Sequence, residues 1–154
     1  MKSPESLKSV AEFHKTFKHP IEAEPVIPAP ERCALRVSLI AEELKELEEA
    51  IANKDLVEVA DALCDIQYVL SGAVLEFGLG DKFKELFDEV QRSNMSKACK
   101  TEEEAQKTVE YYKTERNTES YYKEIDGLYL VYRKEDDKTL KSVNYSPADL
   151  KKIL

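Results

Sequence analysis

Tryptophan is absent from this sequence, and only four of its 154 residues are glycine. Scarce glycine combined with abundant Glu, Lys, Leu and Ala favours helices. No apolar run is long enough to cross a membrane and no signal-peptide pattern is present, so we expect a cytoplasmic protein that does not bind membranes. Three cysteines without metal-type spacing, Cys33, Cys64 and Cys99, are expected to be reduced thiols.

Positive charge is also in short supply, because 23 Lys and Arg residues face 31 Asp and Glu residues, a net charge of −8. Such a chain does not attract a phosphate backbone by bulk electrostatics, so we expect no nucleic-acid partner. It can still bind a polyphosphate if metal ions lie between the two negative partners. The hydrophobic fraction of 42% suffices for a core, and the length suits one domain over residues 1–154.

Apolar periodicity predicts an all-α fold, an antiparallel helical bundle followed by a small C-terminal β-hairpin. The first helix is expected to start at Ser3-Pro4-Glu5, and a loop with four prolines follows it. Further helices are predicted over residues 31–52, 55–77 and 81–94, with Asp55 and Asp81 as caps. The link between the second and third helices is so short that they must be antiparallel neighbours.

The second predicted helix carries apolar residues at alternating spacings of three and four, which predicts a buried seam. The seam residues are Cys33, Val37, Ile40, Leu44, Leu47 and Ile51. Residues 98–125, with a polar helical stretch at 101–116, are interpreted as an insertion or arm. The β-rich run 128–132 is expected to pair with residues 139–143, within a tail of residues 126–154.

Acidic residues concentrate between positions 42 and 65, where only two lysines oppose them. They are Glu42, Glu43, Glu46, Glu48, Glu49, Asp55, Glu58, Asp61 and Asp65. At about 100° per residue, the carboxylates of Glu58, Asp61 and Asp65 share one face of the third helix with Tyr68. An E-x-x-E on the second helix can therefore face an E-x-x-D on the third. Converging carboxylates raise each other's pKa or bind cations, and their oxygen atoms suit Mg²⁺ or Mn²⁺.

Plainer interpretations stand beside this one. An isolated E-x-x-E is usually a solvated helix face, which is how we interpret Glu48 and Glu49. Glu58 could serve only as the capping-box partner of Asp55. His14 and His19 are expected to face solvent or lie in a loop. Arg36 and Arg92 are expected to be surface charges.

Five short stretches carry a resemblance to a known family: EELKE at 42–46, EVAD at 58–61, DIQYVLSG at 65–72, NMSK at 94–97 and KSVNYSPADL at 141–150. They resemble the all-α nucleoside triphosphate pyrophosphatase superfamily, which includes MazG, dimeric dUTPases and phosphoribosyl-ATP pyrophosphohydrolase. The family pattern of five acids is matched completely. Residues 98–125, and Ser142-Val143 where Gly-Pro is expected, depart from the short members.

The resemblance implies a helical catalytic bundle in residues 1–97 that works as a homodimer or dimer of dimers. It implies Mg²⁺-dependent cleavage of a (deoxy)nucleoside triphosphate into monophosphate and pyrophosphate, and Mn²⁺ is the alternative metal. Phosphoribosyl-ATP, in histidine biosynthesis, is the alternative substrate. An alternative of another class is a non-catalytic helical protein whose acidic face binds a basic partner.

Site residues are carried over by position from the same resemblance. It implies the metal ligands Glu43, Glu46, Glu58 and Asp61. Glu42 joins Glu43 as a catalytic residue, either as an extra ligand or as the group that orients and deprotonates the attacking water. Substrate contacts are expected from Asp65, Tyr68, Asn94 and Lys97. On a plainer interpretation, Asn94 and Lys97 are helix-end polar residues and Tyr68 is a core tyrosine.

Overall fold

A computed structural model describes residues 2–154, which form two compact units, one that ends at Phe83 and one that runs from Lys84 to Leu154. The chain is mostly helical with one two-stranded antiparallel sheet near its C-terminus, which confirms the predicted fold class. Within the described residues, no helix is both long and apolar enough to span a membrane.

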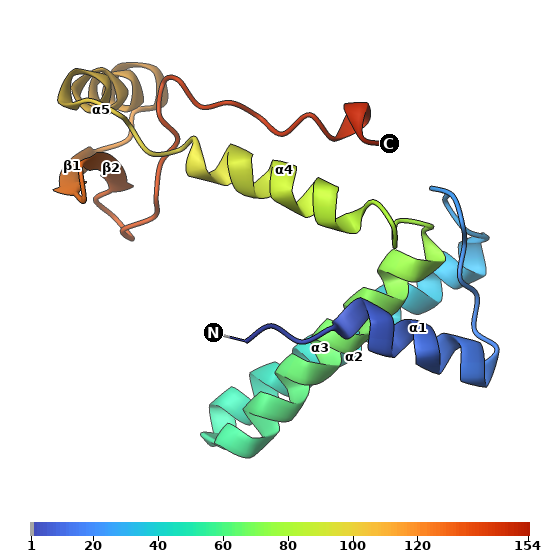
Figure 1. The fold of residues 1–154 in the computed structure, drawn as a ribbon. Helices are drawn as coiled ribbons and strands as arrows, with labels where there is room; N and C mark the ends of the chain where they lie inside the picture. The colour runs from blue at the N-terminus through green and yellow to red at the C-terminus, as the bar shows by residue number, and fades with distance from the viewer. Residues whose placement is uncertain (1) are drawn as a thin grey trace. The chain divides into compact units, whose positions relative to one another are not determined.

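The N-terminal unit contains three helices: α1 (Ser6–Phe17), α2 (Pro30–Asn53) and α3 (Leu56–Glu76). As Figure 1 shows, α2 and α3 run side by side as an antiparallel pair, and α1 packs against α3. The Asp55 carboxylate caps α3 by accepting bonds from the backbone N–H groups of Val57 and Glu58 at 3.0 and 3.2 Å, as predicted. The first helix begins at Ser6, two residues later than Pro4, where the prediction placed its start.

The contact between α2 and α3 uses a different stripe of α2 from the predicted apolar seam. Arg36 and Ala50 are buried, and Glu43, midway between them, is half-buried. These positions are seven residues apart, so they lie on one face of the helix. The predicted seam was wrong for three residues, because this rotation leaves Val37, Leu44 and Ile51 exposed by 69%, 50% and 59%.

A buried ionic cluster explains that rotation. The Glu76 carboxylate, which is 1% exposed, accepts hydrogen bonds from the guanidinium groups of Arg36 and Arg32. Burial alone would raise the pKa of Glu76, but the two arginines outweigh it and hold this pKa below its ordinary value. His14 is also buried, and its Nδ1 lies 2.8 Å from the carbonyl oxygen of Pro20. The expectation that Arg36 and His14 face solvent was therefore wrong.

Gly72 of α3 lies against this cluster. A Cβ atom at Gly72 would lie 2.6 Å from Nη1 of Arg36 and 3.1 Å from Nε2 of His14. Both distances are too short for an unstrained contact, so glycine lets the two buried side chains approach the backbone of α3. The glycine of the DIQYVLSG stretch therefore has a packing role.

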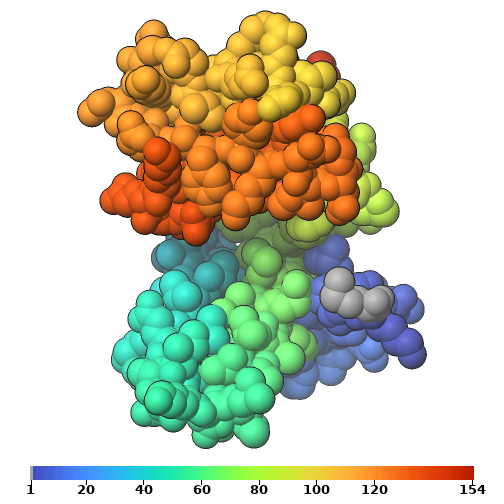
Figure 2. All heavy atoms as spheres, turned by 90° about the vertical axis from the view of Figure 1, so that its left-hand side faces the viewer, coloured from blue at the N-terminus to red at the C-terminus, as the bar shows by residue number. Residues whose placement is uncertain are grey.

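The C-terminal unit contains most of α4 (Phe83–Met95), then α5 (Glu102–Arg116) and the hairpin of β1 (Ser120–Ile125) with β2 (Leu128–Arg133). In Figure 2 the atoms of α5, in yellow, and of the hairpin, in orange, form one continuous mass. Its buried core consists of Cys99, Ala105, Val131 and Leu140.

The predicted hairpin partner of β2 was wrong. β2 pairs with β1 through the two-residue turn Asp126-Gly127, whose positive φ angles of 52° and 77° suit Asp-Gly. Residues 139–143 form no strand, and Thr139 makes only an isolated bridge with Tyr132. The Asp-Gly dipeptide was the sequence signal for the correct pairing.

We predict that Gly72→Ala destabilises the protein by about 1 kcal/mol in urea unfolding. Overpacking of a core typically costs about 1–3 kcal/mol, against a gain of about 1 kcal/mol from replacing a helical glycine. Gly80→Ala is the matched control, because a Cβ there meets only Cδ2 of Leu75 at 3.4 Å. A Gly72→Ala variant as stable as the wild type would show that the cluster tolerates the extra methyl group.

Candidate functional site

The acidic residues singled out from the sequence lie on the antiparallel pair α2 and α3. Glu42, Glu43 and Glu46 lie on α2, in the half nearer the turn into α3. Glu43 is half-buried in the stripe that faces α3, whereas Glu42 and Glu46 are exposed. Asp61 and Asp65 lie one turn apart on α3. Two helices therefore present carboxylates along one side of their shared interface.

The negative charges of these groups act on one another. The pKa of Glu43 is raised, first because the group is partly withdrawn from water and then because Asp65, Glu46, Glu42 and Asp61 surround it with negative charge. Two of those four neighbours come from the other helix. The structure therefore brings together five of the acids selected from the sequence, with Glu43 in the middle of them.

Glu58 lies one turn before Asp61, in the first turn of α3. Its charge is not among those that raise the pKa of Glu43. The backbone N–H of Asp55 donates to the carbonyl oxygen of Ala50 at 3.0 Å, so no capping box is needed at this helix start. The Glu58 side chain is exposed. The capping-box interpretation of Glu58 was therefore wrong, and its carboxylate remains a candidate ligand.

A divalent cation suits this set of donors by its chemistry. Within residues 2–154, no three His, Cys, Asp or Glu side chains are arranged closely enough to hold a metal ion as they stand. The donors are nevertheless all carboxylate oxygens, and their mutual repulsion at Glu43 is what a hard cation would relieve. The residues therefore fit Mg²⁺ or Mn²⁺ in ligand type.

A hollow of about 430 Å³ lies between the N-terminal part of α1 and α3. Tyr68 lines it and packs edge-on against Phe13, with ring centroids 5.6 Å apart. Tyr68 follows Asp65 by three residues on the same helix, so the hollow adjoins the acidic face. Gln67 and Cys64 also line the hollow, and Cys64 is a free, exposed thiol.

The two remaining predicted site residues lie in the C-terminal unit. Nζ of Lys97 donates a hydrogen bond to Oδ1 of Asn94 at 2.8 Å, just after the end of α4. Asn94 is exposed and Lys97 is half-buried. The expected substrate contacts of Asn94 and Lys97 stay predictions. The pair does place an ammonium group beside a side-chain amide.

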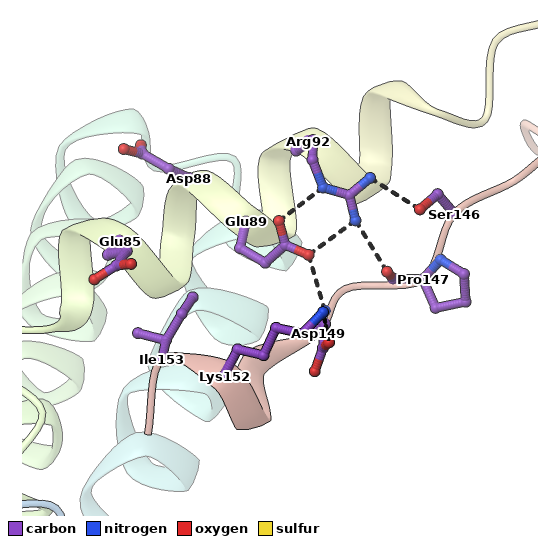
Figure 3. Close-up of a pocket in the computed structure, with 9 residues that line it drawn as sticks. All are labelled: Glu85, Asp88, Glu89, Arg92, Ser146, Pro147, Asp149, Lys152 and Ile153. Atoms are coloured by element: carbon purple, nitrogen blue, oxygen red, sulfur yellow. Dashed lines mark hydrogen bonds and ion pairs between the residues drawn. The ribbon is translucent and has the colours of Figure 1, made fainter.

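The larger hollow of the C-terminal unit, about 720 Å³, separates α4 from the tail (Figure 3). The Glu89 carboxylate accepts from Nε and Nη2 of Arg92 at 2.7 and 2.8 Å and from the backbone N–H of Asp149 at 2.8 Å, and its pKa falls to about 2. Arg92 also donates to Ser146 and to the carbonyl oxygen of Pro147. Glu89 and Arg92 are both bonded to the C-terminal tail. We therefore interpret this hollow as part of the structural contact between α4 and the tail.

Comparisons with known proteins converge on the acid-bearing part of the chain. The family model described as "Phosphoribosyl-ATP pyrophosphohydrolase" matches residues 10–94, which is more than half of the sequence. The chain is also 27% identical to "Uncharacterized protein L479" of Acanthamoeba polyphaga mimivirus, over 88% of this chain and 90% of that protein. The family match contains α2, α3 and all the acids gathered around Glu43.

Glu43→Gln is predicted to raise the thermal midpoint of the metal-free protein at neutral pH. Because folding raises the pKa of Glu43, the folded state loses stability as pH climbs above the ordinary value of 4.5, and this loss persists at higher pH. Removing the titrating group removes that loss. Glu48→Gln, at an exposed position of α2, is the control with the same change in net charge.

Calorimetric scans in EDTA and in Mg²⁺ measure both effects. Mg²⁺ should stabilise the wild type and Glu48→Gln but not Glu43→Gln, since binding to the native state alone raises stability. Equal responses of all three proteins would mean that the carboxylates do not share a cation.

Proposed function

This chain belongs to the phosphoribosyl-ATP pyrophosphohydrolase family of MazG-like all-α pyrophosphohydrolases, and we propose that it cleaves a (deoxy)nucleoside triphosphate into a monophosphate and pyrophosphate with Mg²⁺. The observation that carries the proposal is the gathering of carboxylates from α2 and α3 around Glu43. The N-terminal unit carries a net charge of −7, so these acids would repel a triphosphate unless metal ions lay between them. Mn²⁺ fits the same oxygen donors.

The proposed roles are those that the family resemblance implies, and the positions of the acids on α2 and α3 support them. Glu43, Glu46, Glu58 and Asp61 would hold the metal through their carboxylate oxygens. When bound, the divalent ion would neutralise phosphate charge and make the attacking water easier to deprotonate. Glu42, exposed beside Glu43, orients the attacking water and accepts its proton. The water oxygen attacks the α-phosphorus, the bond from that phosphorus to the bridging oxygen breaks, and pyrophosphate leaves.

The nucleoside end of the substrate has a place beside these acids. The 430 Å³ hollow between α1 and α3 falls within the size range of small-molecule sites. Tyr68 supplies an aromatic surface for a base, and Asp65 supplies an acceptor for a sugar hydroxyl or an amino group. Nε2 of Gln67 donates a hydrogen bond to Oγ of Ser71 at 3.1 Å, so the amide oxygen of Gln67 can serve as the acceptor.

Phosphoribosyl-ATP is the second candidate substrate, favoured by the description of the matching family. The same bond is cleaved, so the same metal-binding carboxylates serve either substrate. The two candidates differ only in whether the base carries a second phosphoribosyl group.

Assaying pyrophosphate release from each common ribo- and deoxyribonucleoside triphosphate and from phosphoribosyl-ATP, with Mg²⁺, tests the proposal. Asp61→Asn is expected to lose at least about 100-fold in kcat, the scale of losing one group that stabilises the transition state. Glu49→Gln, exposed on α2, should retain full activity. An Asp61→Asn variant that folds and turns over like the wild type would favour the non-catalytic, partner-binding alternative.

We also propose that the protein is a homodimer, or a dimer of dimers, assembled through the α2–α3 pair. Leu56, Leu63 and Leu70 recur every seven residues on α3 and are 79%, 52% and 41% exposed. They lie about 140° or more around α3 from Asp61, so the apolar face and the acidic face are separate. With the exposed stripe of α2, they form the kind of apolar surface that helical bundles cover with another copy.

Val37→Asp should therefore convert the assembly to a 17.6 kDa monomer in sedimentation experiments. The charge would have to be buried without a partner in the dimer, which is costly. Ile125→Asp changes an exposed apolar residue of the hairpin and should leave the assembly unchanged. A wild-type protein that sediments as a monomer at all concentrations would refute the assembly.

A further inference from the structure

Another hollow of the C-terminal unit lies outside the residues matched by the family model. It measures about 410 Å³ and is bounded by the C-terminal half of α5 and by residues 141–145. Two kinds of side chain dominate its wall, the aromatic rings of Tyr111, Tyr112 and Tyr145 and the cations of Arg116 and Lys141. Rings and cations together are what a ligand with a flat base and a phosphate requires.

The two cations are held over aromatic rings and not by acids. Nζ of Lys141 lies 4.3 Å from the centroid of the Tyr145 ring, and Cζ of Arg116 lies 5.9 Å from that of Tyr111. Across residues 2–154, neither cation forms an ion pair with a carboxylate. Arg133, by contrast, is neutralised by Asp136. The hollow therefore has positive charge available for an anion.

More positive charge converges at Tyr145. The pKa of its phenol is lowered, first by a hydrogen bond with Ser93 and then by the positive charges of Lys141, Lys97 and Arg92. The backbone N–H of Ser142 bonds to the carbonyl oxygen of Lys97 at 3.2 Å, which brings the NMSK stretch beside this wall. The basic character is local, because the whole chain carries a net charge of −8.

The wall is also built in advance of any ligand. The hydroxyl of Tyr112 accepts from the backbone N–H of Lys141 at 3.1 Å, and that of Tyr145 lies 2.9 Å from Oγ of Ser93. Nε of Arg116 donates to the hydroxyl of Tyr111 at 3.2 Å. Side chains that are already ordered lose little entropy on binding, so a small ligand can be bound here.

We propose that this hollow is a metal-independent binding site for a mononucleotide. Lys141 and Arg116 bind its phosphate, and the exposed ring of Tyr111 stacks on its base. The occupant is a single nucleotide and not a strand of nucleic acid, because the chain carries a net charge of −8 and would repel a longer phosphate backbone. This site does not depend on the proposed hydrolase activity.

Titration calorimetry of the full chain in EDTA with AMP tests the proposal, with ribose 5-phosphate and adenosine as partial ligands. AMP should bind more tightly than either fragment, and its affinity should fall as salt rises. Lys141→Met and Arg116→Met should each weaken AMP binding by at least about tenfold, the effect of losing one charge-assisted contact.

Lys123→Met is the matched control. Lys123 also lies over tyrosine rings, 5.4 Å from the centroid of Tyr121, but it does not line the hollow. Lys123→Met should leave AMP binding unchanged. The circular dichroism spectra of all variants should match that of the wild type. Absence of AMP binding at millimolar concentration, or equal loss in all three variants, would overturn the site. Tighter binding of an oligothymidylate than of AMP would replace the mononucleotide with single-stranded nucleic acid.

Discussion

The ion pair between Arg36 on α2 and Glu76 on α3 sets the rotation of the two longest helices against each other. Glu76 is almost completely buried and accepts hydrogen bonds from Arg36 and Arg32. Any rotation that moved Arg36 away would leave a buried carboxylate without a counter-charge, which is far more costly than exposing aliphatic side chains. The pair therefore fixes the rotation of α2 against α3, because separating the two buried charges would cost so much free energy.

Two properties of the N-terminal unit follow from that rotation. Glu43, seven residues after Arg36, is turned toward α3 and meets the charges of Asp61 and Asp65. The same rotation turns Leu44 away from α3, so an apolar stripe remains exposed for a second copy of the chain. The proposed catalytic centre and the proposed dimer contact are thus two consequences of one buried contact.

The two units divide the chemistry of the chain between them. The N-terminal unit holds nine Lys and Arg residues against sixteen Asp and Glu residues, a net charge of −7, and offers carboxylates that require a cation. The C-terminal unit is nearly neutral at −1 and offers ring-bound cations that need no metal. According to our proposals, the N-terminal unit binds phosphates through metal ions and the C-terminal unit binds them through its own side chains.

Sequence alone determined the helical class, the cap at Asp55 and the pairing of acids on two neighbouring helices, because these depend on local periodicity and on a short link. It also indicated the assignment of the family. Tertiary structure alone decided which face of α2 is buried, since an ionic contact across 40 residues overrode the apolar seam that contains Val37. It likewise decided the strand partner of β2 and the burial of His14, because both depend on packing between distant segments that no local pattern encodes.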